Sequence, residues 1–376
     1  MPDWIKPMQQ TFEYYIVDPF SWKDTRKLDN VTSCTIERDA EADTLGSATI
    51  DVTESLGECY IRIYLVAIQN GVIDKFPLGT FLVQTPSSTF DGKIREVSMD
   101  AYTPLIELKE SPPPLGYSLL EGEEIMSKAY TLVRENARAP VVASNSDAIL
   151  YTDFVANTDD TWITFLSDLI ANAKFIFDLD EMGRILFAPK QDTASLQPVW
   201  TYDDSNSSIL YPEITMKHDL YGIPNVIQIV YSNGSKQIYA EARNEDNTSP
   251  LSIHNRGREI IYRITDPNLN GNPTQTYLNE YVAKTLKETS SLEYTLKYSH
   301  GYCPVRIGDC VRLNYERAGI TDVKAKVISQ KISCKPGCKV NETAIFTKNL
   351  ANKIKVVSGD GTAVEINTLT WEVTKL

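Results

Sequence analysis

Short segments in which apolar and polar residues alternate, each followed by turn-forming residues, occupy most of this chain. Residues 47–53 (SATIDVT) and 59–68 (CYIRIYLVAI) show the period-two pattern of a half-buried strand. Residues 76–102 contain two further strand patterns joined by a polar turn that includes Asp91-Gly92, which predicts a hairpin. Closely spaced strands with short turns predict a small barrel or sandwich at the beginning of the chain.

Three consecutive prolines in residues 110–116 end this first region, because proline can continue neither a helix nor a strand ladder. Beyond them, residues 123–135 and 159–173 each place their apolar side chains along one helical stripe. Residues 174–190 then predict a hairpin around Glu181-Met182-Gly183. This second region is therefore predicted to be a small α+β module.

Strand patterns resume after residue 200 and are interrupted by one amphipathic helix, predicted at 274–289 after the loop 266–273. Near the end of the chain, Asp360-Gly361 predicts another hairpin. The fold class expected is α+β, mostly β, with two small β-barrel domains, the second split by the helical insertion, and the α+β module between them. The predicted domains are a first β-barrel at 1–110, the α+β module at 111–200, a second β-barrel at 201–340 and a small β-rich segment at 341–376.

The charge of the chain limits the partners it can have. It has 37 basic and 50 acidic residues, a formal net charge of −13. A protein that reads nucleic-acid sequence needs a basic surface to neutralise phosphates, so such a function is disfavoured. No apolar run is long enough to cross a membrane, and the N-terminus lacks the pattern of a signal peptide. We therefore expect folding in a cytoplasm.

Motifs of known catalytic chemistry are missing from the sequence. The three histidines, His218, His254 and His300, are isolated from one another, and an isolated histidine is more often a surface or packed residue than a ligand. The sequence contains no phosphate-binding glycine loop and no GxSxG motif. It therefore predicts that the chain is not an enzyme. A hydrolase that brings together carboxylates from distant positions stays open as an alternative.

Four of the six cysteines, Cys303, Cys310, Cys334 and Cys338, lie close together in the sequence. Thiolates gathered at neighbouring hairpin ends bind zinc or a [4Fe–4S] cluster in other proteins. The spacings C-x6-C and C-x3-C are wider than those of common zinc ribbons. Two other interpretations stay open: the cysteines are small apolar residues of a β core, or they form disulfides, which a cytoplasm disfavours.

Several stretches resemble the hub proteins of phage tails. Residues 76–108, with "FPLGTFLVQTP" leading into "AYTPLIEL", are similar to the N-terminal barrel of these proteins. Residues 241–260 (EARNEDNTSPLSIHNRGREI) resemble a loop and strand of their second barrel. "VRIGDCVRL" and "ISCKPGCKVNETA" resemble the strands that close it. The matches follow one another in the order of the family and cover most of the chain.

This resemblance implies a structural hub of a phage, or phage-derived, tail tip or baseplate. Family members form homotrimers whose six barrels make a pseudo-sixfold ring, joining a hexameric tail tube or distal tail protein to a threefold tip, spike or fibre protein. The ring leaves a channel for DNA and the tape measure protein, so DNA passes without sequence-specific binding and contact with the host membrane is only indirect. The implied location is the virion tail, assembled in the host cytoplasm. Some lambda-like hubs carry a four-cysteine iron–sulphur site, which favours [4Fe–4S] over zinc for the four cysteines.

The main alternative is a tail protein that binds a carbohydrate or another receptor. Such a protein presents exposed aromatic side chains, and this chain has 20 tyrosines and five tryptophans. Many of these aromatic residues fall at alternating strand positions or on helical stripes, where burial in a core explains them.

Overall fold

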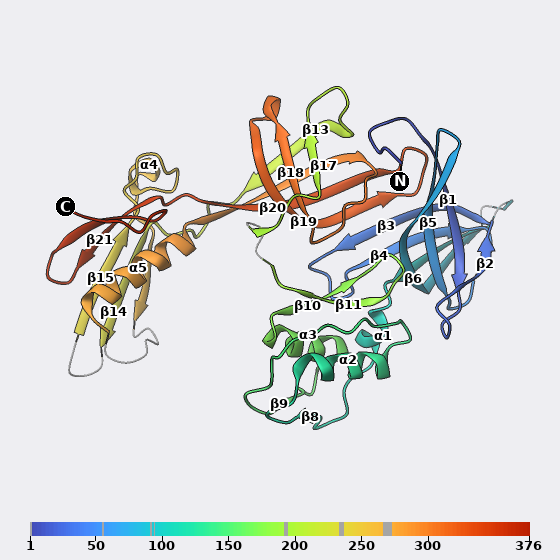
Figure 1. Cartoon of the computed structure of the whole chain (residues 1–376), viewed down its shortest axis with the longest axis horizontal. Coiled ribbons are helices and arrows are strands. Elements are labelled where there is room, and N and C mark those ends of the chain that lie inside the picture. The colour runs from blue at the N-terminus through green and yellow to red at the C-terminus, as the bar shows by residue number, and fades with distance from the viewer. Residues whose placement is uncertain are drawn as a thin grey trace. The chain divides into compact units, whose positions relative to one another are not determined.

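The computed structural model describes residues 2–54, 56–90, 92–93, 95–191, 195–232, 237–265 and 273–376. Strands greatly outnumber helices among them, which confirms the mostly β character that the sequence predicts (Figure 1). The chain forms two compact units: unit 1 contains Met1–Thr215 and Lys297–Ala344, and unit 2 contains Met216–Leu296 and Ile345–Leu376. The chain crosses from one unit to the other within three strands: β13 (Leu210–His218), β17 (Ser291–Gly301) and β20 (Lys339–Asn349).

Unit 1 is built on a large sheet, to which the described residues contribute thirteen strands in the order β13-β17-β20-β19-β3-β4-β7-β6-β5-β1-β2, with β18 on β19 and β12 on β18. The remaining strands are β1 (Gln9–Val17), β2 (Asp24–Leu28), β3 (Val31–Asp39), β4 (Gly46–Val52), β5 (Tyr60–Gln69), β6 (Val72–Phe90), β7 (Arg95–Tyr102), β12 (Trp200–Asp203), β18 (Cys310–Tyr315) and β19 (Ile320–Ser333). A 3-10 turn, η2 (Glu316–Ala318), joins β18 to β19. The strand pairings among the described residues form no closed ring, and the two-barrel arrangement stays a prediction.

One ladder of this sheet joins the beginning of the chain to its end. Strands β3 and β19 pair antiparallel, with Thr35 opposite Ser333 and Arg38 opposite Gln330. Along the strand order, this ladder connects the strands before residue 103 to those after residue 199. Contacts across it therefore hold together segments that are about three hundred residues apart in sequence.

Both strands predicted from alternation at 47–53 and 59–68 are present, as β4 and β5, but only β4 is half-buried. In β4, Ala48, Ile50 and Val52 are buried and the residues between them are more exposed, as the period of two requires. The prediction that residues 59–68 form a half-buried strand is wrong, because the first eight residues of β5 are buried on both faces. Arg62 occupies a polar position of the pattern, yet its side chain is only 1% exposed.

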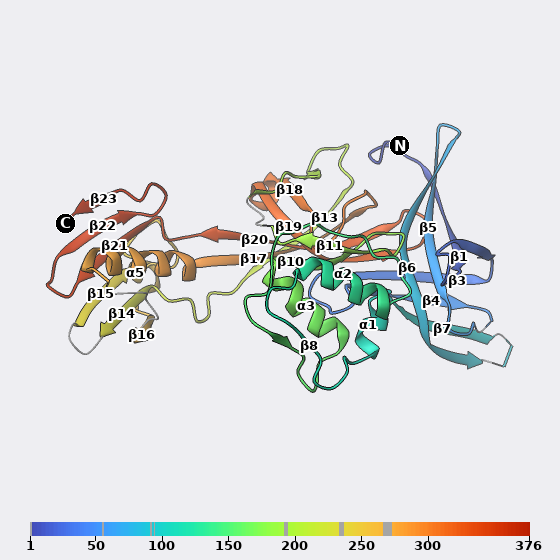
Figure 2. The same ribbon diagram turned by 60° about the horizontal axis from the view of Figure 1, so that its bottom comes forward.

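The α+β module packs within unit 1, and its predicted helices and hairpin are confirmed. Figure 2 shows α2 and α3 side by side, and both helices contribute buried residues to one apolar core together with Phe177 and Phe187 of the hairpin. Thr161 caps α3, because its hydroxyl accepts a hydrogen bond from the Thr164 N–H. The elements are α1 (Ile106–Glu110), β8 (Ser118–Leu119), α2 (Ile125–Asn136), β9 (Phe154–Val155), α3 (Trp162–Asn172), β10 (Phe175–Leu179) and β11 (Ile185–Pro189).

Unit 2 has a six-stranded sheet in the order β16-β14-β15-β21-β22-β23. Helix α5 (Gln275–Thr289) lies across it and buries Leu278, Val282 and Leu286 against the sheet (Figure 2), which confirms the helix predicted at 274–289. The hairpin predicted over Asp360-Gly361 is confirmed between β21 and β22. The other elements are β14 (Val226–Ser232), β15 (Gln237–Arg243), α4 (Ile253–Arg256), β16 (Ile261–Thr265), β21 (Lys353–Ser358), β22 (Ala363–Asn367) and β23 (Val373–Lys375).

Two sequence predictions fall on residues outside those described: the turn at Asp91 and the loop 266–272. The predicted domain limits at residues 110, 200 and 340 stay a prediction. No helix within the described ranges has the length and the apolar composition needed to cross a membrane.

Candidate functional site

The turn of the β10–β11 hairpin is held against the large sheet, and this junction is the first candidate site. The carbonyl oxygen of Met182 accepts hydrogen bonds from Trp22 Nε1 at 2.7 Å and from Arg62 Nη2 at 3.0 Å. Gly183 follows with φ +76°, and a Cβ atom there would lie 2.7 Å from Cβ of Thr80. Only glycine fits this turn without strain, so the close approach of the hairpin to the sheet depends on it.

Arg62 of β5 is buried, and its charge is compensated by neighbouring groups. Its guanidinium forms an ion pair with Asp24 at 2.7 Å and donates a hydrogen bond from Nε to Thr80 Oγ1 at 2.9 Å. The Tyr64 hydroxyl donates to the other Asp24 oxygen at 2.7 Å. A buried cation is stable only when it is paired and hydrogen-bonded, and these contacts, with the Met182 carbonyl, meet that requirement.

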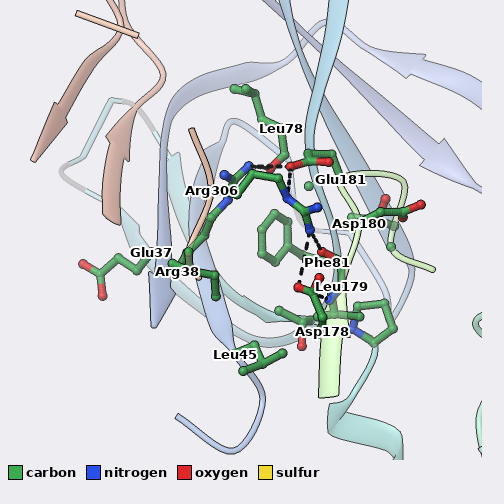
Figure 3. A pocket seen from close by; sticks show the side chains of 16 residues that line it. Glu37, Arg38, Leu45, Leu78, Phe81, Asp178, Leu179, Asp180, Glu181 and Arg306 are labelled. Carbon is green, nitrogen blue, oxygen red and sulfur yellow. Dashed lines mark hydrogen bonds and ion pairs between the residues drawn. The ribbon is translucent and has the colours of Figure 1, made fainter. Parts of the chain in front are cut away.

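A second arginine, Arg306, also contacts the hairpin (Figure 3). Arg306 Nε lies 2.7 Å from Glu181 Oε1, and its Nη2 donates to the Leu179 carbonyl and lies 3.4 Å from Asp178 Oδ1. Burial raises the pKa of Asp178, and the positive charge of Arg306 offsets part of that rise. The ring of Phe81 lies among these side chains, in a cavity lined by residues of the hairpin and the sheet. Two arginines thus contact the hairpin, and they anchor the α+β module to the sheet.

A second candidate site is a polar cluster buried inside the sheet. Glu342 of β20 accepts hydrogen bonds at Oε1 from the Tyr298 hydroxyl and at Oε2 from Gln330 Nε2, 2.7 Å away. His300 Nε2 lies 3.3 Å from the same Oε2 atom and 3.1 Å from the Tyr202 hydroxyl. All five side chains are buried, and they come from β12, β17, β19 and β20. The cluster therefore ties together strands of distant sequence.

Cys303 lies 3.9 Å from His300 Nδ1, so cysteine, histidine and glutamate occur in the order of a catalytic triad. Burial argues against that role, because a substrate cannot reach three side chains that are at most 2% exposed. Burial alone lowers the pKa of His300, but hydrogen bonds to Cys303 and Glu342 and the Glu342 charge raise it to about 10. The imidazolium then directs one N–H to Glu342 and the other to the Gly301 carbonyl, 2.7 Å away. Both ring nitrogens are thus hydrogen-bonded inside the cluster, so the arrangement suits a structural ion pair.

The structure does not bring the four predicted metal ligands together. Cys334 lies near Cys34 of β3 and Cys338 lies near Cys334, whereas Cys303 contacts Tyr202 and His300. The Cys310 thiol points to the carbonyl of Val311, 3.9 Å away. Within the described ranges, no three His, Cys, Asp or Glu side chains are arranged to hold a metal ion. The donor set therefore does not fit a four-sulphur site, and metal binding stays a prediction for direct analysis.

The other two histidines are separate from both candidate sites. The His218 ring packs against Tyr294, with centroids 4.9 Å apart, and His254 lies in α4. Sequence reasoning missed the residues that matter most here, Arg62, Arg306 and Glu342. Each stands at a position where a strand or loop usually places a solvated charge, so the local pattern gives no signal of its burial or pairing.

No known family model and no curated protein sequence matches this chain. Solved structures do. The tail protein from Neisseria meningitidis MC58 is 13% identical, with 91% of this chain and 98% of that chain covered and a TM-score of 0.58. The 43 kDa tail protein of prophage MuSo2 from Shewanella oneidensis is 12% identical, with 89% and 98% covered and a TM-score of 0.58.

The chain has the fold of a phage tail protein. The predicted resemblance to phage tail proteins is thus confirmed at the level of the fold, over nearly the whole length of both tail proteins. The predicted location in a virion tail agrees with this fold. At 12–13% identity the likeness concerns the fold, and the candidate sites above are described from this chain's own residues.

Proposed function

We propose that this chain is a structural hub protein of a phage, or phage-derived, tail tip or baseplate. The observation that carries the proposal is a fold shared with two tail proteins over about nine tenths of the chain. The charged groups described above support it, because Arg62, Arg306 and Glu342 hold the strands and the α+β module in place.

In the proposed assembly, three copies form a ring in which two barrel-like parts of each chain imitate six subunits. Closed rings of repeated interfaces are the usual way to build such an adaptor. One face of the ring meets the hexameric tail tube or distal tail protein, and the other meets a threefold tip, spike or fibre protein. The central channel admits DNA and the tape measure protein. The ring is located in the virion tail and assembles in the host cytoplasm.

The acidic composition supports passage of DNA through this channel. A trimer carries a formal charge of −39, three times that of one chain. Acidic side chains that face the channel repel phosphates, so DNA slides past them instead of binding. Exchanging several channel-facing acids for lysine is expected to slow DNA ejection from assembled particles. Ejection at the unchanged rate would contradict this part of the proposal.

Native mass spectrometry and electron microscopy of the purified protein test the proposed ring. One chain has a mass of 42.3 kDa, so a trimer has a mass of about 127 kDa. We expect this species, alone or after addition of the tail tube protein of the same particle, and class averages with threefold symmetry around a hole. A chain that stays monomeric in assembled particles, or a ring of another symmetry, would refute the proposal.

One surface of unit 2 favours the carbohydrate-binding alternative. The rings of Tyr277 and Tyr281 are stacked, and they line a groove together with Trp371, Glu280 and Lys284. Trp371 is 42% exposed and adopts φ +60°, a conformation that non-glycine residues seldom hold without a reason. Aromatic faces beside charged groups suit sugar rings. A glycan array separates the functions: a hub gives no signal, and binding lost in Trp371→Ala would establish a glycan site.

A further inference from the structure

Two buried cysteines from opposite ends of the sequence face each other across the ladder that joins the halves of the large sheet. Thr35 pairs with Ser333 at the end of the β3–β19 register, so Cys34 and Cys334 occupy the next position. The Cys334 N–H donates to the Cys34 carbonyl at 3.0 Å, which shows that the antiparallel pairing continues to this position. Their side chains therefore point to the same face of the sheet.

The geometry of this pair suits a covalent bond. The Cα atoms of a hydrogen-bonded antiparallel pair lie about 5.5 Å apart, and disulfides span Cα distances of about 4.4 to 6.8 Å. The two thiols are within hydrogen-bonding reach of each other, and this contact is the largest influence that raises the pKa of Cys334. Cys338 also lies near Cys334, but Cys334 raises the pKa of Cys338 only through its charge. Cys34 is therefore the better partner for Cys334.

We propose that Cys34 and Cys334 form a redox-sensitive cross-link, reduced in a cytoplasm and closed as a disulfide when the protein meets an oxidising environment. The oxidant is a small-molecule disulfide of the glutathione type. The thiolate of Cys334 attacks it, forms a mixed disulfide and releases one glutathione thiol. The Cys34 thiolate then attacks the Cys334 sulphur and displaces the second glutathione, so two protein thiols are oxidised and one glutathione disulfide is reduced to two thiols.

The position of the pair determines both the rate and the effect of this reaction. Both side chains are buried, at 1% and 7% exposure, and burial keeps thiols slow to react. Cys334 lies just beyond the last residue of β19, where the end of a ladder opens locally more easily than its centre, so oxidation is expected to be slow but complete. The bond would join the two halves of the sheet at the ladder that connects them.

The experiment oxidises the reduced full-length protein with glutathione disulfide and counts free thiols by alkylation under denaturing conditions. The chain has six free cysteines, so we expect two fewer alkylated sites after oxidation. Peptide mapping without reduction should find the Cys34 peptide joined to the Cys334 peptide. The melting temperature should rise by roughly 5 °C, because a cross-link that closes a long loop restricts the unfolded chain.

Two serine variants sharpen the result. Cys334→Ser should lose no thiols on oxidation and keep its melting temperature, whereas the matched control Cys338→Ser should lose two thiols and gain the same stability as the unmodified chain. The peptide map of the unmodified protein decides the matter even if a variant fails to fold. A Cys334–Cys338 link, a lasting glutathione adduct on Cys334, or a full set of free thiols after prolonged oxidation would overturn the proposal.

Discussion

The buried carboxylate of Glu342 provides the sharpest test of how the large sheet is held together. Its two oxygens contact Tyr298, Gln330 and His300, and the Glu342 and His300 side chains are both fully buried. Glu342→Gln keeps the size of the side chain and removes its charge, so the variant leaves the His300 imidazolium without a counter-charge. The substitution therefore tests the ion pair without opening a cavity.

Two independent arguments give similar magnitudes for the loss. Removing one partner of a buried ion pair costs about 3 to 5 kcal/mol of unfolding free energy. The pKa of His300, raised from 6.5 to about 10, corresponds to about 5 kcal/mol at roughly 1.4 kcal/mol per pH unit. Cys303 supplies part of this shift, so about 5 kcal/mol is the upper limit for the share that Glu342 contributes. For a protein unit of this size, a loss of that order lowers the melting temperature by about 10 °C.

The sign of the pH dependence follows from the same shift. A histidine whose pKa is raised by folding contributes all of its stabilisation below the unfolded value of 6.5, and this contribution is lost as pH rises through about 10. Melting temperatures measured by calorimetry from pH 6 to pH 10 should therefore differ most between the unmodified chain and Glu342→Gln at the acidic end. The difference should shrink steadily toward pH 10.

Glu37→Gln is the matched control. Glu37 pairs with Lys331 across the β3–β19 ladder of the same sheet at 2.6 Å, but the two side chains are 54% and 57% exposed. Exposed pairs contribute about 0 to 1 kcal/mol, so this variant should melt within about 2 °C of the unmodified chain. Equal losses in the two variants, or a Glu342→Gln loss that does not change with pH, would refute the account of a charged, buried histidine pair.

Three further predictions concern the hairpin junction, a helix cap and the cysteines. Gly183→Ala should destabilise the chain by roughly 2 kcal/mol more than the control Gly222→Ala in chemical denaturation. Both glycines have positive φ, but only a Cβ atom at residue 183 would meet Thr80. Equal losses in the two variants would contradict the close approach of the hairpin to the sheet. Thr161→Ala should cost about 1 kcal/mol in the same assay, since it removes the cap of α3, and an unchanged midpoint would show that the Thr161 side chain is dispensable. Elemental analysis of protein purified without oxygen tests the metal site predicted at the four cysteines, which lie apart in the structure. Four irons or one zinc per chain would confirm the site, and protein free of both metals would reject it.

Elements set by local chemistry could be predicted from the sequence. The amphipathic stripes of residues 123–135, 159–173 and 274–289 identified α2, α3 and α5 within a few residues of their ends. The turn glycines at positions 183 and 361 identified two hairpins correctly. These signals depend only on neighbours in the chain, because helix periodicity and turn conformation are local properties.

The pairing of β3 with β19 could not be read in the same way. Alternation shows which residues of a strand share a face, but it contains no information on which strand lies next to it. About three hundred residues separate the partners, and the ladder leaves no mark on either segment. The proximity of Cys34 to Cys334 depends on that ladder, and for this reason the sequence grouped Cys334 with Cys303 and Cys310 instead.

Polar residues in strands raise a deeper ambiguity, which Arg62 and Glu342 illustrate. In a period-two pattern, a charged residue at an outward position looks the same whether water or another element covers that face. The difference lies in the partners: Asp24, Thr80 and Met182 for Arg62, and Tyr298, Gln330 and His300 for Glu342. Since burying an unpaired charge is costly, each charge restricts how its surrounding elements can pack. In this chain the residues that look most like ordinary surface charges hold the hairpin and the strands of the sheet in place, so substitutions there should disturb the fold more than any exposed acidic residue does.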